Sequence, residues 1–493
     1  MVKMPPYLFS MKKITKIILI LLVWLVCVGF YQTTKKLPEN LNFRGKKRAI
    51  AVENIEFLYD LTYRNDNGDI ISEQTIFNEI FSLIDGAQVF IIIDAFLFNA
   101  YTREPDKVYR HLTSELAERL AKKKEANPSI QIDFITDPIN TVYGGSTNSE
   151  IERLKGAGVN VIVTDLKALP DSNPIYSAFW RTFIQWFGNS EQNGLLPHPF
   201  TGGEPKVTLR SYLDMLNFKA NHRKVFMADR KDHAVVILTS GNPHDGSSAH
   251  SNVALKISGN IWQDVYAAEA AIAKLSDRKL QEPLQEIDKE IRREAEHAKI
   301  VFLTENQIKK ELLARIRQTI ANDEIRMALF YLSDRQIIKA LVDASERGVH
   351  IKVILDPNKD AFGFEKIGVP NQPVAEELLN RSSSKIQVRW YDTHGEQFHT
   401  KLALIKHGTQ ATLLLGSANF TRRNLDNYNL EANVAVTAGE EALFIKAVED
   451  YLDRIWDNRD GKTYTVGYES YKDASALKKL IYFIQEYAGL SSF

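Results

Sequence analysis

The chain has 493 residues, 44% of them hydrophobic and 25% charged, which is typical of a folded protein with two domains or one large duplicated one. Its 62 basic and 62 acidic residues cancel, which excludes a strong overall field drawing the chain to nucleic acid. The single cysteine, Cys27, excludes an intramolecular disulfide and a cysteine-based metal site.

The first predicted element is an apolar segment near the amino terminus. Residues 17–31, IILILLVWLVCVGFY, carry no charge, and lysines precede and follow them. The run is shorter than the roughly 20 residues of a spanning helix, but no small-residue cleavage site follows it. We expect residues 1–35 to be an uncleaved, single-pass signal anchor in the cell membrane. A cleaved signal peptide and a buried globular helix are the alternatives. The lysines at both ends leave the orientation open, and we expect the rest of the chain to be extracytoplasmic.

Four continuous apolar runs come next, at 89–98, 130–138, 325–333 and 351–357. A helical pattern precedes the second run of each pair, at 108–124 and 335–348. Runs without alternation are typical of strands buried on both faces, and their alternation with helices predicts an α/β sheet in each half of the chain.

The chain also repeats itself. NHRKVFMADRKDHAVVILTSGN at 221–242 has a counterpart that begins with FHTKLALIKH at 398. A constant offset of 177 relates five pairs: His222 and His399, Lys224 and Lys401, Ser240 and Ser417, Asn242 and Asn419, and Asn252 and Asn429. Each match has a chance of about one in twenty, so the set indicates a duplication.

This duplication sets the expected domain organisation. The first half spans 50–275 and the second spans 301–460, and both end their second apolar run in Asp-Pro. A charged helical linker is expected at 276–300, and a helical tail that docks on the second half at 461–493.

The first half carries an insertion at about 165–215. Within it, NPIYSAFWRTFIQWFG at 173–188 places apolar and aromatic residues on one helical face. One interpretation is a helix that packs on the core. The other is an aromatic interfacial helix or substrate lid that dips among lipid headgroups, which Trp180 and Trp186 favour.

Alternate residues of a strand share a face, so His222 projects with Lys224, and His399 with Lys401. If the halves pack about a pseudo-twofold axis, both pairs meet in one cleft suited to a phosphate ester. The supporting donors would be Ser240, Asn242, Ser417 and Asn419. Lysines and amides would hold the phosphoryl oxygens. One imidazole would attack phosphorus to form a phosphohistidine, while the other acts as acid and then base. In this scheme two lysines supply the positive charge that a metal ion would otherwise supply, so no metal or cofactor is expected.

The chain resembles, over about residues 70–455, the phospholipase D superfamily, whose members carry duplicated H-x-K-x4-D and G-S-x-N motifs. The resemblance implies two pseudo-twofold-related α/β halves that share one active-site cleft, here preceded by a single transmembrane helix. It also implies that the phosphate-handling residues are His222, Lys224, His399, Lys401, Asn242 and Asn419.

Some positions depart from the family pattern. Asp229 completes the first motif, but Lys406 stands where the second motif has aspartate, and the first half reads TSGN in place of Gly-Ser-x-Asn. Glu431 lies 32 residues after His399 and fits a carboxylate that orients an imidazole, so we expect it to support His399. The same spacing from His222 leads to Ala254, and the roles of the two histidines stay open.

The leading functional hypothesis is a membrane-anchored phosphodiesterase that acts on phospholipid at the membrane surface. It would transfer the phosphatidyl group to water or to another alcohol. Cardiolipin synthases resemble the chain in motif and length, although they typically have two amino-terminal spans. The alternatives are a nuclease of the same superfamily, which the neutral charge disfavours, and a catalytically impaired protein that binds anionic lipid. Nucleic acid is not an expected partner, and the sequence leaves the oligomeric state open.

Overall fold

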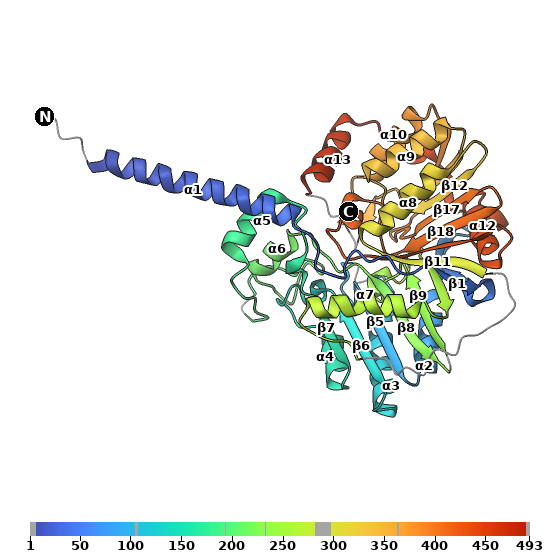
Figure 1. Ribbon diagram of the computed structural model, residues 1–493, viewed down its shortest axis with the longest axis horizontal. Coiled ribbons are helices and arrows are strands. Elements are labelled where there is room, and N and C mark those ends of the chain that lie inside the picture. The colour runs from blue at the N-terminus through green and yellow to red at the C-terminus, as the bar shows by residue number, and fades with distance from the viewer. Residues whose placement is uncertain are drawn as a thin grey trace.

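The computed structural model describes residues 6–103, 107–192, 194–231, 233–281, 297–361 and 364–489. Two large β-sheets form the centre of its body, one from each half of the chain (Figure 1). In order across the first sheet, the strands are β2 (Ile55–Tyr59), β10 (Val253–Ser258), β9 (His233–Thr239), β8 (Lys224–Arg230), β5 (Phe90–Ala95), β6 (Gln131–Thr136) and β7 (Asn160–Val163).

The second sheet repeats this order and adds one strand at each edge. Its strands are β1 (Arg48–Ala51), β11 (His297–Thr304), β19 (Ala432–Gly439), β18 (Gln410–Gly416), β17 (Lys401–His407), β12 (Glu324–Leu329), β13 (His350–Leu355), β16 (Ile386–Tyr391) and β20 (Thr465–Gly467). The edge strand β1 precedes the first half in sequence, yet it pairs antiparallel with β11. The predicted α/β fold with two related halves is therefore confirmed.

Helices cover the outer face of each sheet, and the inner faces pack together. The first outer layer contains α2 (Ile76–Gly86), α3 (Leu112–Ala126) and α4 (Ser149–Gly156). The second contains α8 (Asn306–Gln318), α9 (Arg335–Glu346), α10 (Asn371–Arg381) and α13 (Ala476–Ala488). A shared core joins strands of both sheets with α7 (Trp262–Leu275) and α12 (Leu443–Trp456). Because both faces of each sheet are covered, its central strands are continuous apolar runs.

The strand registers revise one part of the predicted repeat. Thr239 pairs with Ala254 between β9 and β10, and Gly416 pairs with Asn433 between β18 and β19. Equivalent residues of the two halves are thus 177 positions apart in β9 and β18, and 179 positions apart in β10 and β19, which follow the connecting loops. The structural counterpart of Asn252 is therefore Glu431, and the match of Asn252 with Asn429 is coincidental.

The N-terminal helix α1 (Pro6–Thr34) extends away from the body (Figure 1). Its segment Lys13–Thr34 is long and apolar enough to cross a membrane. Near its end the helix packs on α5 (Pro174–Phe179) of the insertion. Gly29 lies so close to α5 that a β-carbon there would come within 2.9 Å of the Pro174 carbonyl oxygen.

The insertion is less regular than the predicted amphipathic helix. After α5 the chain forms a π-helical turn at Trp180–Ile184, and α6 (Leu209–Met215) follows later. Trp180 is 3% exposed, whereas Trp186 is 75% exposed. The expectation of one shared apolar face for the segment is therefore wrong, because Trp180 packs inward against the guanidinium groups of Arg181 and Arg210.

Most of the predicted linker, residues 282–296, lies outside the described residues. Its last predicted residues, 297–300, are not helical but begin β11. The tail ends in α13, whose Tyr482 hydroxyl donates to the Ser333 carbonyl oxygen at 2.9 Å, so this helix docks on the second half.

A buried arginine connects the two halves. Arg223, between the predicted catalytic residues of the first motif, is fully buried. Its guanidinium contacts Glu269 of α7 at 3.2 Å and Glu305, which precedes α8, at 2.7 Å. Glu305 also accepts the backbone N–H of Glu431 at 3.1 Å, so this network links the interface to the motif region.

Replacing Arg223 with methionine should lower the free energy of unfolding by about 3–5 kcal/mol, because the change leaves two buried carboxylates without their cation. Chemical denaturation of the detergent-solubilised chain, followed by tryptophan fluorescence, measures this loss. Lys339→Met breaks the exposed pair with Asp343 and should leave stability nearly unchanged. Equal stability of Arg223→Met and the native chain would contradict a structural role for the network.

Candidate active site

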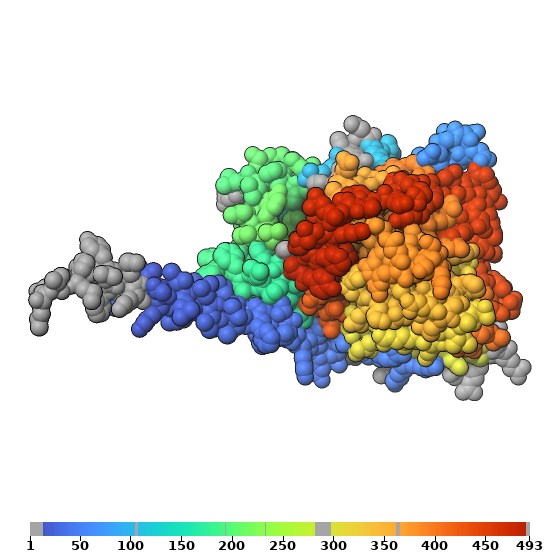
Figure 2. Space-filling model, turned by 90° about the horizontal axis from the view of Figure 1, so that it is seen from above, coloured from blue at the N-terminus to red at the C-terminus, as the bar shows by residue number. Residues whose placement is uncertain are grey.

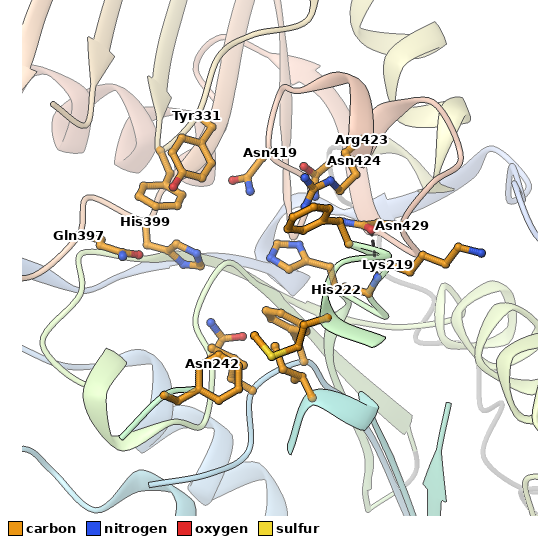
Figure 3. A pocket seen from close by; sticks show the side chains of 18 of the residues that line it. Lys219, His222, Asn242, Tyr331, Gln397, His399, Asn419, Arg423, Asn424 and Asn429 are labelled. Atoms are coloured by element: carbon orange, nitrogen blue, oxygen red, sulfur yellow. Dashed lines mark hydrogen bonds between the residues drawn. The ribbon is translucent and has the colours of Figure 1, made fainter. Parts of the chain in front are cut away.

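A cavity of about 600 Å³ lies where the two halves meet, and both His222 and His399 line it. Figure 3 shows the two imidazoles pointing toward one another, with Asn242 and Asn419 on opposite sides of the space between them. The structure therefore brings the two histidines of the repeated motifs together in one pocket, as the pseudo-twofold arrangement predicts.

Each motif occupies the start of a central strand. Lys224 begins β8 and Lys401 begins β17, and each ammonium group donates to the carbonyl oxygen of its own histidine at 2.8 Å. An aromatic ring supports each pair: the Phe96 ring lies 4.9 Å from the Lys224 Nζ, and Phe330 lies 5.1 Å from that of Lys401. The same two rings contact the imidazoles, so each half builds its part of the pocket in the same way.

The Asp-Pro turns fix the backbone that leads into each histidine. The Asp137 carboxylate accepts the backbone N–H of Asn221 at 2.7 Å, and Asp356 accepts that of Phe398 at 2.7 Å. Asn221 and Phe398 are the residues immediately before the two histidines. Burial raises the pKa of each aspartate to about 7. The sequence revealed these repeated turns, but their connection to the histidines becomes visible only in the fold.

The partners of the imidazoles cross between the halves. His222 Nδ1 lies 2.9 Å from the Glu431 carboxylate of the second half. His399 Nδ1 lies 3.2 Å from the Asn252 side-chain oxygen of the first half. The expectation that Glu431 supports His399 is therefore wrong. Short spacing in sequence suggested a partner within the same half, whereas the pseudo-twofold axis places each loop opposite the other half's histidine.

These contacts define which ring nitrogen faces the cavity. A carboxylate only accepts hydrogen bonds, so His222 donates from Nδ1 and leaves Nε2 free for chemistry. The Asn252 amide nitrogen donates to the His250 carbonyl oxygen at 3.1 Å, which directs its oxygen toward His399. His399 therefore donates from Nδ1 as well.

The two serines support these partners. Ser240 donates to the Asn252 oxygen at 3.2 Å, and Ser417 donates to Glu431. Glu431 also accepts a hydrogen bond from Asn424. In contrast, Asn242 and Asn419 line the cavity and their buried side-chain oxygens have no hydrogen-bond partner in the described structure. The serines thus orient side chains, while these two amides are available to a ligand.

The last position of each motif lies away from the cavity. Asp229 lies one residue before the end of β8 and accepts backbone N–H groups of Gln88, Val89 and Phe90, which secures the start of β5. Lys406, at the matching position of β17, pairs with Glu449 at 2.7 Å and Glu440 at 3.2 Å. The departure at Lys406 therefore leaves the pocket itself unchanged.

Burial and crowded positive charge dominate the electrostatics. Burial lowers the pKa of His222 to about 4, although Glu431 works in the opposite direction. Burial, Lys401 and other nearby cations lower the pKa of His399 well below its usual value. Burial also lowers the pKa of Lys224 to about 7, and burial together with Lys224 lowers the pKa of Lys401 well below its usual value. An anion in the cavity would reverse these shifts, because it stabilises each cationic form.

Away from the histidines the cavity is apolar. The insertion and the chain after it supply one wall, formed by Phe200, Tyr212, Met215, Leu216 and Phe218. Phe96, Leu97 and Ile139 continue this surface in the first half. The pocket thus combines a cationic, amide-rich end with long apolar walls, which suits an amphipathic ligand that carries a phosphate.

Comparison with known proteins agrees with this geometry. Residues 312–456, within the second half, match the family described as cardiolipin synthase, PLD-like domain. These residues therefore match a phospholipase D-like domain. The fold of the chain is also similar to that of phosphatidylserine synthase from Haemophilus influenzae Rd KW20, with a TM-score of 0.56, 12% sequence identity, and coverage of 92% of this chain and 97% of the other.

Two curated relatives match a shorter part of the chain. The mitochondrial cardiolipin hydrolases of Homo sapiens and Mus musculus are each 28% identical over 145 residues, which is 29% of this chain. These matches cover 50% of the human protein and 57% of the mouse protein, so the chain spans about half the length of the curated relatives it matches.

Replacing Glu431 with glutamine should reduce kcat for phosphodiester cleavage by about 100-fold or more. The change removes the charge that favours the imidazolium form of His222 and the acceptor that fixes its ring. Turnover of a chromogenic phosphodiester measures the loss, and thermal unfolding checks that the variant is folded. Glu449→Gln, which removes a carboxylate beside Lys406, is the matched control and should keep native kcat. A folded Glu431→Gln variant with native kcat would contradict this role.

Proposed function

We propose that the protein is a membrane-anchored phosphodiesterase that cleaves phospholipids or transfers their phosphatidyl groups through a phosphohistidine. The observation that carries the proposal is one cavity with two opposed imidazoles at a cationic end and apolar walls elsewhere. The family match and the names of the relatives, which concern cardiolipin and phosphatidylserine, support phospholipid as the substrate class.

We propose the same site residues that the sequence predicts. The catalytic residues are His222, Lys224, His399 and Lys401, and Asn242 and Asn419 bind phosphoryl oxygens. The supporting residues are Asp229, Ser240, Ser417 and Glu431. Lys224 and Lys401 would regain their full charge beside a phosphodiester anion.

We assign the nucleophile to His222 on the basis of its carboxylate partner. Attack of Nε2 on phosphorus makes the ring cationic, and Glu431 would stabilise that charge at 2.9 Å from Nδ1. The bond from phosphorus to the leaving alcohol breaks as the His222–phosphorus bond forms. His399, protonated when the anionic substrate binds, donates its Nε2 proton to the leaving oxygen.

The second step reverses these roles. Water or a second alcohol enters the position that the first alcohol leaves, and His399 accepts its proton. The new oxygen–phosphorus bond forms as the phosphorus–His222 bond breaks, which returns His222 to its neutral state. Water gives phosphatidate, and an alcohol gives a new phosphodiester.

His222→Ala and His399→Ala should each reduce release of a labelled phospholipid headgroup by about 1,000-fold or more, because each removes one participant in covalent and acid–base catalysis. Brief incubation with substrate labelled on its phosphorus, followed by peptide mapping at alkaline pH, where phosphohistidine is preserved, should place the label on His222. Label on His399 would overturn the assigned roles.

The same preparations separate the competing functions. Added glycerol should divert product from phosphatidate to phosphatidylglycerol if an alcohol enters the cavity. Cleavage of DNA in place of lipid would support a nuclease. Lipid binding with no product from the native chain would indicate a catalytically impaired protein and contradict the proposal.

A further inference from the structure

A second hollow, of about 390 Å³, lies beside the reaction cavity. We call it the basic hollow and define it by its four lining cations, Lys167, Arg181, Arg210 and Lys219. It shares Tyr143 and Lys219 with the reaction cavity. Figure 3 shows the Lys219 side chain pointing away from the two histidines, so this lysine does not face the proposed reacting phosphorus.

The basic hollow lies where the membrane helix joins the body. The Trp24 indole of α1 donates to the Thr182 hydroxyl at 3.2 Å, and Lys35, just after α1, donates to the Lys167 carbonyl oxygen at 3.1 Å. Figure 2 shows α1, in blue, ending beside the green insertion that contains most of the hollow's lining. A ligand in the hollow would therefore sit near the level at which α1 leaves the membrane.

Positive charge exceeds negative charge around this hollow. Among the described lining residues, Asp214 is the only carboxylate, and it pairs with Arg210. Behind the lining, the fully buried Asp171 is shared by Arg181, at 2.9 Å, and Lys219. Lys35 adds a further cation to this group. Asp171 is thus shared among several cations, and the remaining positive charge suits the hollow to an anion.

The lysine pKa values agree with this charge excess. Burial lowers the pKa of Lys219 to about 7, with Asp171 opposing the shift and Arg181 and Lys35 adding to it. Burial and Arg181 likewise lower the pKa of Lys35 to about 8. Both lysines would be stabilised in their charged forms by an anion bound among them.

The rim of the hollow is aromatic and exposed. Trp186 and Phe187 line it, and both side chains face solvent over most of their surface. Phe183 and Phe179, on the adjacent turns, are also exposed. Tryptophan and phenylalanine beside cations are typical of protein surfaces that meet the headgroup region of a bilayer.

We propose that the basic hollow binds the headgroup phosphate of an anionic phospholipid that does not react, while its acyl chains lie against Trp186 and Phe187. This inference stands apart from the catalytic proposal, because it invokes none of the histidines. The bound lipid would hold the insertion against the membrane and favour anionic regions of the bilayer.

The test uses the full chain in phosphatidylcholine nanodiscs, with His222→Ala and His399→Ala to prevent turnover. A minor fraction of the lipid is phosphatidylglycerol with brominated acyl chains, and a parallel sample contains brominated phosphatidylcholine. Bromine quenches tryptophan fluorescence on contact, and the difference from a Trp186→Phe chain isolates the signal of Trp186. We expect stronger quenching by brominated phosphatidylglycerol than by brominated phosphatidylcholine.

Lys167→Ala with Lys219→Met should weaken the preference for phosphatidylglycerol about ten-fold or more, because each cation near an anionic headgroup adds to its affinity. Asp171 keeps Arg181 as its partner in this variant, and circular dichroism checks its fold. Lys206→Ala removes an exposed lysine of the same insertion outside the lining and should keep the preference.

Several outcomes would overturn the inference. Equal quenching by the two brominated lipids, in the chain that keeps all four cations of the basic hollow, would show that the hollow selects no anionic headgroup. If Lys206→Ala weakened the preference for phosphatidylglycerol as much as Lys167→Ala with Lys219→Met does, the preference would come from positive charge spread over the surface and not from the basic hollow. Removal of the preference by inorganic phosphate at concentrations similar to those of the lipid would identify a free phosphate site. Headgroup release by the histidine-containing chain is measured separately, so failure of one proposal leaves the other standing.

Discussion

The contact between His222 and Glu431 joins a histidine of one half to a carboxylate of the other, and the architecture of the pocket depends on it. Its counterpart, between His399 and Asn252, crosses in the opposite direction. Neither half contains a complete histidine environment. The buried network around Arg223 and Glu305 holds the same interface together, so folding of the interface and assembly of the pocket are one event.

The two crossed contacts differ in charge, and this difference separates two otherwise equivalent histidines. A carboxylate stabilises a cationic ring, whereas an amide orients a ring without stabilising its charge to the same degree. The repeated Asp-Pro turns, lysines and aromatic rings are symmetric, so the two imidazoles differ most directly in their Nδ1 partners. A duplicated fold can in this way supply two chemical roles from one structural plan.

Much of this fold could be predicted from the sequence, because continuous apolar runs and the repeated motifs report directly on buried strands and on duplication. The pairing of Glu431 with His222 could not, since a change of offset from 177 to 179 within one loop is invisible without strand registers. The insertion also differs from its prediction: helical spacing places Trp180 with the exposed aromatic residues, but the π-helical turn rotates it inward onto two arginines.

The edge strand β1 has a consequence for how the pocket is entered. It runs between α1 and the first half, yet it is hydrogen-bonded into the sheet of the second half. The first half is therefore connected to the second both through β1, which precedes it, and through the chain that follows it. Opening the two halves as rigid bodies would require β1 to separate from β11. We expect a ligand to arrive through movement of the insertion wall, beside α1, while the paired sheets stay closed.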